Sequence, residues 1–379
     1  MDSVGDTTNQ GAELWWSVCK PAIAGLLDSA GTYTEDEKVS QLAFFRRHVV
    51  PWLGPQPLSD GIHAVNPIDA ISPVEASINF TANGKPIVRY QYEPLSATRQ
   101  HQEAKERLGQ EHVRQMLSQI EVELNKPDLR WAHQFIEQLF PKNEDETALA
   151  LIRAKSELPP PLDHALTFNM ALDLDGAQRK MKAYMFPMAK NLATNRHRDA
   201  RDAGFDAIRN LRPNGDRLAP SLDFLDSYWD TCPEHLTLDM IGMDCIDPCK
   251  ARVKIYAHTT TCNSWDIVQH IYTFGGKAVE PERLHGLEIL HSIWDTLRDE
   301  RPYTPDNHSK QMRHPTSFLG SLMFSFEIKP GREVPDVKVY VPMWQYAPSD
   351  GHVTNNLLSA FSKLGWFDVA KVRKFRSPV

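Results

Sequence analysis

The feature that most constrains the fold is a fourfold repetition of paired strand-like segments, with helical stretches between the pairs. The expected strands lie near 74–81 with 86–93, 165–174 with 180–187, 236–243 with 251–258, and 319–328 with 335–342. Turn-like stretches such as Asn83-Gly84 and Asp247-Pro248 join the members of a pair. Short turns join antiparallel strands, so the pattern predicts an α+β chain, an antiparallel β-barrel with an outer ring of helices.

The stretches between the strand pairs have helical patterns. Thr34 and Glu37 have capping-box spacing before an apolar set, and Pro51 is expected to end that helix. Apolar stripes at helical spacing also run through 97–125 and 281–298. Because the same elements continue on both sides of the triple proline at 159–161, we expect one domain over residues 1–379.

Composition and charge exclude several classes of partner. The chain is 41% hydrophobic with a formal net charge of −7, which gives no electrostatic reason to expect nucleic acid or an anionic membrane as partner. No apolar run approaches the roughly 20 residues that cross a bilayer. The first eleven residues do not resemble a signal peptide. We therefore expect a cytoplasmic protein.

Five cysteines do not form a disulfide framework, and reduced thiols are expected. Cys245 and Cys249, with Cys232 and Cys262 nearby, raise the alternative of a zinc site. The close pair has C-x3-C spacing around a proline turn, so buried or incidental thiols are favoured and no metal is expected.

The second strand of three pairs contains the pattern Lys-x-Tyr. The residues that share it are Lys182 and Tyr184, Lys254 and Tyr256, and Lys338 and Tyr340; Arg89 and Arg252 supply further cations. Residues two apart share a face of a strand, so these side chains should line the interior of the barrel. The alternative is a solvated face of an antiparallel sheet, where such patterns are common.

Several cations in a partly desolvated cavity require a polyanion, and a diphosphate fits them. Tyrosine rings among them can shield an allylic cation. The sequence contains no phosphate-binding loop, and Gly275-Gly276-Lys277 is interpreted as a helix end. It also lacks a D-D-x-x-D cluster for magnesium, and Asp199, Asp202 and Asp206 are interpreted as a solvated helix face. We therefore expect protein cations in place of a metal, and no cofactor.

Glu75 is the candidate catalytic residue. It shares a face of its expected strand with Ser77 and Asn79, and an ionised carboxylate there could accept the N–H of an indole. The alternative is an ordinary polar strand position.

The chain resembles the fungal dimethylallyltryptophan-synthase-type indole prenyltransferases over nearly its whole length. The matching stretches include Pro73-Val-Glu-Ala-Ser, Val88-Arg-Tyr-Gln-Tyr-Glu-Pro, Lys182-Ala-Tyr-Met-Phe-Pro, Lys250-Ala-Arg-Val-Lys-Ile-Tyr, Phe326-Glu-Ile-Lys-Pro-Gly and Pro335-Asp-Val-Lys-Val-Tyr. The resemblance implies the ααββ barrel of that family, with ten strands, dimethylallyl diphosphate as donor and no required metal. It implies that the cations and tyrosines named above bind or shield the diphosphate, and that Glu75 holds the acceptor N–H. Met323 falls where the family limits the length of the prenyl chain.

Two features of the sequence depart from that family. Asn169 stands where many members have a lysine proposed as the base that restores aromaticity. Only four strand pairs are found, so the last pair of the family is expected to be missing.

The expected function is therefore metal-independent transfer of a dimethylallyl group to an aromatic acceptor, an indole of secondary metabolism. The alternatives are a phenolic or polyketide acceptor, or an impaired relative that only binds ligand. The partners would be the diphosphate donor and a small aromatic acceptor, and a homodimer is compatible with the sequence.

Overall fold

The computed structural model describes residues 4–54, 72–80, 85–95, 108, 110–124, 126–157, 166–194, 200–315 and 321–366. Within these ranges all eight expected strands form, and they follow one another in a sheet in chain order. Their bounds are β1 Val74–Asn79, β2 Ile87–Tyr92, β3 Phe168–Asp175, β4 Gln178–Met185, β5 Leu236–Asp244, β6 Val253–Thr259, β7 Met323–Ile328 and β8 Asp336–Tyr340. The predicted strand positions are confirmed to within a few residues at each end.

The chain divides into two compact units. Unit 1 comprises Met1–Asp216 with Met240–Val253, and unit 2 comprises Arg217–Asp239 with Lys254–Pro378. Strand β5 therefore begins in unit 2 and ends in unit 1. The register is antiparallel from β1 through β5, and between β7 and β8.

The helices of unit 1 largely follow the sequence pattern. They are α1 Val4–Ala30, α2 Glu35–Phe44, α4 Glu111–Glu123, α5 Arg130–Leu139, α6 Glu144–Glu157, α7 Met188–Ala193 and α8 Ala200–Arg209. The capping box at Thr34 and Glu37 is confirmed, and Pro51 lies in a short 3₁₀ turn beyond the helix. Helix α4 lies within the expected helix over 97–125, whereas residues 97–107, the expected turn at Asn83-Gly84, the triple proline and Asp199 lie outside the described residues.

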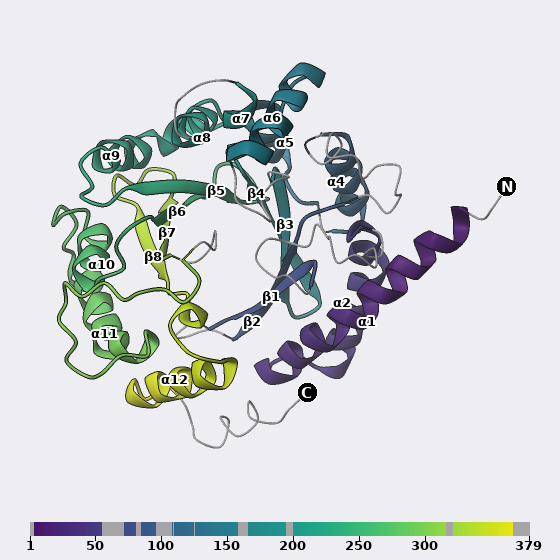
Figure 1. Ribbon diagram of the computed structural model, residues 1–379. Coiled ribbons are helices and arrows are strands. Elements are labelled where there is room, and N and C mark those ends of the chain that lie inside the picture. The colour runs from purple at the N-terminus through teal and green to yellow at the C-terminus, as the bar shows by residue number, and fades with distance from the viewer. Residues whose placement is uncertain are drawn as a thin grey trace. The chain divides into compact units, whose positions relative to one another are not determined.

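One face of the unit 1 strands is apolar and packs against helices. Its fully buried side chains include Val88, Tyr90, Tyr92, Met170, Leu172 and Leu174. Helix α1 contacts β1 and β2, whereas α5 contacts β4 (Figure 1). Phe45 packs edge-on against Tyr90 with 5.2 Å between ring centroids. This side of the sheet is the core, so the polar residues of the same strands project from the opposite side.

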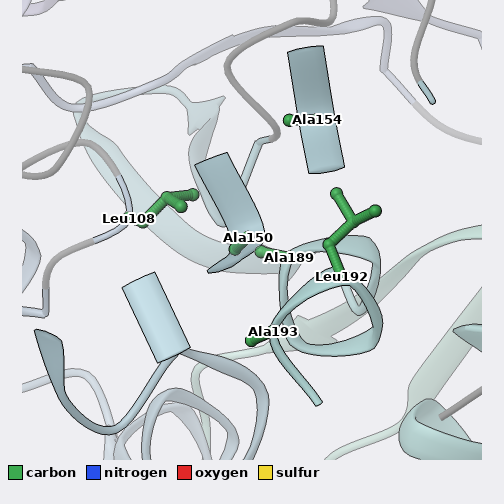
Figure 2. Packing of buried hydrophobic residues seen from close by; sticks show 6 residues of the cluster. All are labelled: Leu108, Ala150, Ala154, Ala189, Leu192 and Ala193. Atoms are coloured by element: carbon green, nitrogen blue, oxygen red, sulfur yellow. The ribbon is translucent and has the colours of Figure 1, made fainter. Parts of the chain in front are cut away.

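Small residues let helices α6 and α7 approach closely. Their cluster consists of Leu108, Ala150, Ala154, Ala189, Leu192 and Ala193 (Figure 2). Four of the six are alanines, whose small side chains allow close approach of the two helices, and the partly buried Leu151 and Met188 pack against the cluster. Hydrophobic packing therefore holds together α6, which precedes β3 in the chain, and α7, which follows β4.

Unit 2 repeats the same arrangement of elements. Its helices are α9 Ala219–Trp229, α10 Trp265–Tyr272, α11 Pro281–Leu297 and α12 Asp350–Lys363. Phe324, Phe326 and Ile328 of β7 are fully buried. Gly275 and Gly276 have positive φ just after α10, which confirms that they end that helix.

No helix in the described part of the chain is long and apolar enough to cross a membrane.

Candidate functional site

The register of unit 1 brings most of its predicted site residues to one face, which we call polar face 1. One row crosses five strands: Glu75 pairs with Gln91, and in turn Gln91 with Ala171, Ala171 with Lys182, and Lys182 with Asp244. In the next row, Arg89 pairs with Asp173. Polar face 1 therefore carries Glu75, Arg89, Lys182 and Tyr184 together, as the alternation in the sequence predicts.

Each cation of polar face 1 is held by a carboxylate. Arg89 donates to Asp173, and the ammonium of Lys182 lies 3.4 Å from the second oxygen of the same carboxylate. Lys182 also donates to Asp244 Oδ1, while Arg252 Nε donates to Asp244 Oδ2 at 2.7 Å. The five side chains form one continuous network of three cations and two carboxylates, with a net charge of +1.

The charge state of Asp244 follows from this network. Burial raises the pKa of its carboxyl, but the charge and hydrogen bond of Lys182, followed by those of Arg252, outweigh burial and hold the pKa below its ordinary value. Asp244 is therefore ionised at neutral pH and keeps both cations in place.

The carboxylates correct one part of the sequence interpretation. The cations were expected to need a bound polyanion because unpaired buried charges are costly. Asp173 and Asp244 already compensate much of that charge in unit 1, and neither was singled out from the sequence. A signal existed for Asp173, because a tight hairpin at Gly176 places it on the same face as Lys182.

The candidate catalytic carboxylate has a neutral neighbour. Gln91 donates an amide hydrogen to Glu75 Oε2 across β1 and β2. Glu75 is only partly buried. The carboxylate is thus oriented by an amide, and it shares its row with Lys182.

Asn169 lies on polar face 1, opposite Tyr184. It is 1% exposed, and neither its Nδ2 nor its Oδ1 has a hydrogen-bond partner in the described part of the chain. A buried amide without partners costs about 1–3 kcal/mol per unsatisfied group, so such a residue calls for an explanation.

The remaining candidates lie on one face of unit 2, which we call polar face 2. Lys254 Nζ lies 3.2 Å from Glu327, and Glu327 also contacts Lys329 at 2.8 Å. Tyr256 and Tyr340 have ring centroids 6.0 Å apart. Glu327 is a third carboxylate that the sequence interpretation missed.

Strands β7 and β8 carry the end of polar face 2. Met323 pairs with Tyr340, and Ser325 with Lys338. Tyr340 is 41% exposed and Lys338 is exposed, as expected for the last strand of the sheet. Among the strands described, β1 and β8 stand at the two ends of the strand order.

The thiols and other potential metal ligands do not gather. In the ranges that the structure describes, no three His, Cys, Asp or Glu side chains are grouped to hold a metal ion. Cys245 is buried, which raises the pKa of its thiol, and Cys249 is exposed.

Antiparallel strand pairs separated by helices, with lysine–tyrosine pairs on the polar faces of the strands, are what the resemblance to aromatic prenyltransferases led us to expect. A family model described as tryptophan dimethylallyltransferase matches residues 12–374. The chain belongs to this family of fungal aromatic prenyltransferases.

Relatives of known activity differ in their acceptor. The chain is 38% identical to the O-glucose prenyltransferase PaPT of Phomopsis amygdali, over 94% of this chain and 79% of that protein. It is 30% identical to the indole prenyltransferase tdiB of Emericella nidulans, over 93% of this chain and 84% of that protein.

Solved structures confirm the fold. The crystal structure of AnaPT from Neosartorya fischeri superposes with a TM-score of 0.79 at 25% identity, covering 96% of this chain and 84% of that one. NotF in complex with brevianamide F and DMSPP gives a TM-score of 0.77 at 20% identity, covering 99% and 88%. The predicted fold class, the α+β fold of the prenyltransferases with antiparallel strand pairs between helices, is thereby confirmed, and eight of its strands lie in the described residues.

Proposed function

We propose that this chain transfers a dimethylallyl group from dimethylallyl diphosphate to a hydroxyl of a glycosylated small molecule, without a metal ion. The cation network of polar face 1 is the observation that carries the donor half of this proposal. Arg89, Lys182 and Arg252 supply the hydrogen bonds and charge that a leaving diphosphate needs. Lys254 and Lys338 on polar face 2 are the candidate diphosphate cations of unit 2.

The carboxylates of the network support preorganisation. Asp173 and Asp244 fix the cations before the donor arrives, so less side-chain entropy is lost on binding. The diphosphate then binds to a network whose net charge is +1, and its own negative charge draws the cations partly away from their carboxylates.

Departure of the diphosphate leaves an allylic cation, which the tyrosines would shield. The candidates are Tyr184 on polar face 1 and Tyr256 and Tyr340 on polar face 2, and such a ring contributes about 0.5–2 kcal/mol by cation–π attraction. Met323 pairs with Tyr340 and would limit the length of the prenyl chain.

Asn169 favours a hydroxyl acceptor. Attack by an indole carbon leaves a C–H proton that a base must remove, and an amide cannot act as that base. A hydroxyl acceptor keeps its acidic proton on oxygen, and the unsatisfied amide of Asn169 can hydrogen-bond to such a polar group. The relative PaPT, named an O-glucose prenyltransferase, supports the same choice.

An indole acceptor is the second candidate, because Glu75 lies in one row with Lys182 and is oriented by Gln91. A carboxylate there could accept an indole N–H. The relative tdiB, named an indole prenyltransferase, supports this alternative.

The test is incubation of the chain with dimethylallyl diphosphate, EDTA and a panel of glucosides, phenols and indoles, followed by mass spectrometry. We expect one added dimethylallyl group on the sugar fragment of a glucoside. Addition only to indoles would favour the second candidate. Donor binding without transfer to any acceptor would contradict both and indicate a ligand-binding relative.

A further inference from the structure

A buried histidine–carboxylate pair in unit 2 has no role in the scheme above. His258 Nδ1 lies 2.8 Å from Asp239 Oδ1, and the side chains are 15% and 3% exposed. Burying a carboxylate this completely costs free energy unless the carboxylate is paired, so this is an internal ion pair and not an incidental surface contact.

The position of His258 on strand β6 places it on polar face 2. Lys254, Tyr256 and His258 alternate with the fully buried Ile255 and Ala257 along this strand. In the proposed function Lys254 would bind the diphosphate and Tyr256 would shield the allyl cation. His258 is the next residue of β6 on the same face. About 13 Å separates the Cα atoms of Lys254 and His258, at about 3.3 Å per residue.

The neighbouring strand confirms this placement. Thr259 N donates to Leu322 O, and Lys254 reaches Glu327, which defines one antiparallel register of β6 and β7. One step back from Thr259 and one forward from Leu322 brings His258 opposite Met323. Met323 pairs in turn with Tyr340. His258 thus stands in the row of the prenyl-length residue, at the opposite end of polar face 2 from Glu327.

A change of phase in strand β5 turns Asp239 towards His258. The buried apolar side chains fall at Leu236 and Leu238 and then at Ile241 and Met243, a spacing of three where strict alternation gives two. An extra residue of this kind re-aims a side chain, as β-bulges do beside active sites. Strict alternation from Asp244 would have put Asp239 on the apolar face.

We infer that His258 is the base that removes the proton of the acceptor hydroxyl, and that Asp239 is its positioning residue. This rests on the proposed transfer to a hydroxyl. As the C1–O bond of dimethylallyl diphosphate breaks, the diphosphate leaves with the electron pair. The acceptor oxygen bonds to C1, and its proton passes to His258 Nε2. Because Nδ1–H donates to Asp239, Nε2 is the basic nitrogen.

The charged groups around His258 are consistent with this role. Asp239 faces it from β5, Lys254 lies further along β6, and Glu327 is on β7. Lys338 and Asp336 lie on β8. Glu327, like Asp173 and Asp244, is already engaged by cations in ion pairs.

The pKa of His258 sets the expected pH dependence. Burial lowers it, but the hydrogen bond and charge of Asp239 together outweigh burial, so the pKa is raised above its ordinary value of 6.5. The imidazole is protonated and inactive as a base below that raised pKa. The rate of transfer should therefore rise with pH, and the acidic limb of its pH profile should lie above pH 6.5.

The experiment compares His258→Gln, Asp239→Asn and the control His285→Gln, an exposed histidine of α11. Transfer to a glucoside and binding of inorganic diphosphate are both measured. We expect His258→Gln to lower kcat for the glucoside by about 10²-fold, the size of a general-base effect, and to abolish the acidic limb. Asp239→Asn should move the limb to lower pH, and the control should match the wild type. In every variant the diphosphate Kd should be unchanged.

Two outcomes would overturn the inference. In the first, His258→Gln has the same rate of transfer and the same acidic limb in its pH profile as the wild type. In the second, His258→Gln loses diphosphate binding and transfer to the same extent, which indicates a structural role. If wild-type protein transfers to no glucoside, the proposed function fails instead. Failure of the proposed function is distinguished from failure of this inference because it is seen with the wild-type protein, before any substitution is made.

Discussion

The ammonium of Lys182 and the carboxylate of Asp244 meet across strands β4 and β5, and Arg252 donates to the same carboxylate at 2.7 Å. One aspartate thus holds two of the cations assigned to the diphosphate. The proposed donor site is therefore largely charge-compensated, with a net charge of +1, and donor binding there would have to exchange ion pairs.

Replacing Asp244 with Asn should destabilise the free protein and strengthen its response to diphosphate. Two neighbouring cations lose their counter-charge, at a cost of about 1–3 kcal/mol, less than for a fully buried pair because Arg252 is 35% exposed. Inorganic diphosphate would restore that charge, so its stabilising shift in Tm should exceed that of the wild type. A smaller shift would mean that Asp244 is needed to position the cations.

The lowered pKa of Asp244 predicts a pH dependence of the free energy of unfolding, which the same substitution can test. The pKa of Asp244 is lower in the folded chain than its ordinary value of 3.8, so the unfolded chain binds more protons and folding is favoured by higher pH. The contribution is complete well above that value and is lost as pH falls below it. Urea unfolding should therefore show a gap between wild type and Asp244→Asn that is widest near pH 7 and narrows below about pH 4. A gap that stays constant would contradict the depressed pKa.

Lys182 and Lys180 offer a matched pair for the donor site. Both lie on the same face of β4, but Lys182 is 11% exposed within the network, whereas Lys180 is 58% exposed and pairs with Asp175. Lys182→Met should weaken diphosphate binding by about 10- to 100-fold, the worth of one charge-assisted hydrogen bond. Lys180→Met should change it by less than about twofold. Calorimetry with inorganic diphosphate measures both, and equal losses would remove Lys182 from the proposed site.

Met323 provides a test of prenyl length. Its side chain is partly buried on polar face 2, beside Tyr340. Met323→Ala removes bulk there, so the ratio of kcat/KM for geranyl diphosphate to that for dimethylallyl diphosphate should rise about tenfold or more, as for other pocket contacts of this size. An unchanged ratio would show that the longer chain does not reach this position.

The strands and their faces could be predicted because both depend on local pattern. Alternation of Lys182 and Tyr184 with apolar residues fixes a face whatever the partner strand is. The tight hairpin at Gly176 was a usable signal for Asp173. Asp244 and Glu327 were missed because ion pairs between strands that no tight turn joins depend on register, which alternation does not give. Asp239 was beyond prediction for a different reason: the extra residue in β5 reverses its face, and no glycine or proline stands between Leu238 and Ile241 to mark the place in the sequence.

Asn169 offers a change of acceptor by a single substitution. Continuing the register of β2 and β3 by one residue beyond Tyr92 and Met170 brings Glu93, which is 6% exposed, opposite Asn169. A lysine at this position would therefore have a carboxylate beside it, so Asn169→Lys should fold. It would supply the base that an indole carbon needs, and C-prenylation of indoles should rise by about tenfold or more. Asn169→Gln keeps an amide and should show no such gain. If the lysine variant folds, binds diphosphate and still shows the wild-type rate with indoles, then the side chain at this position does not determine which acceptor is used.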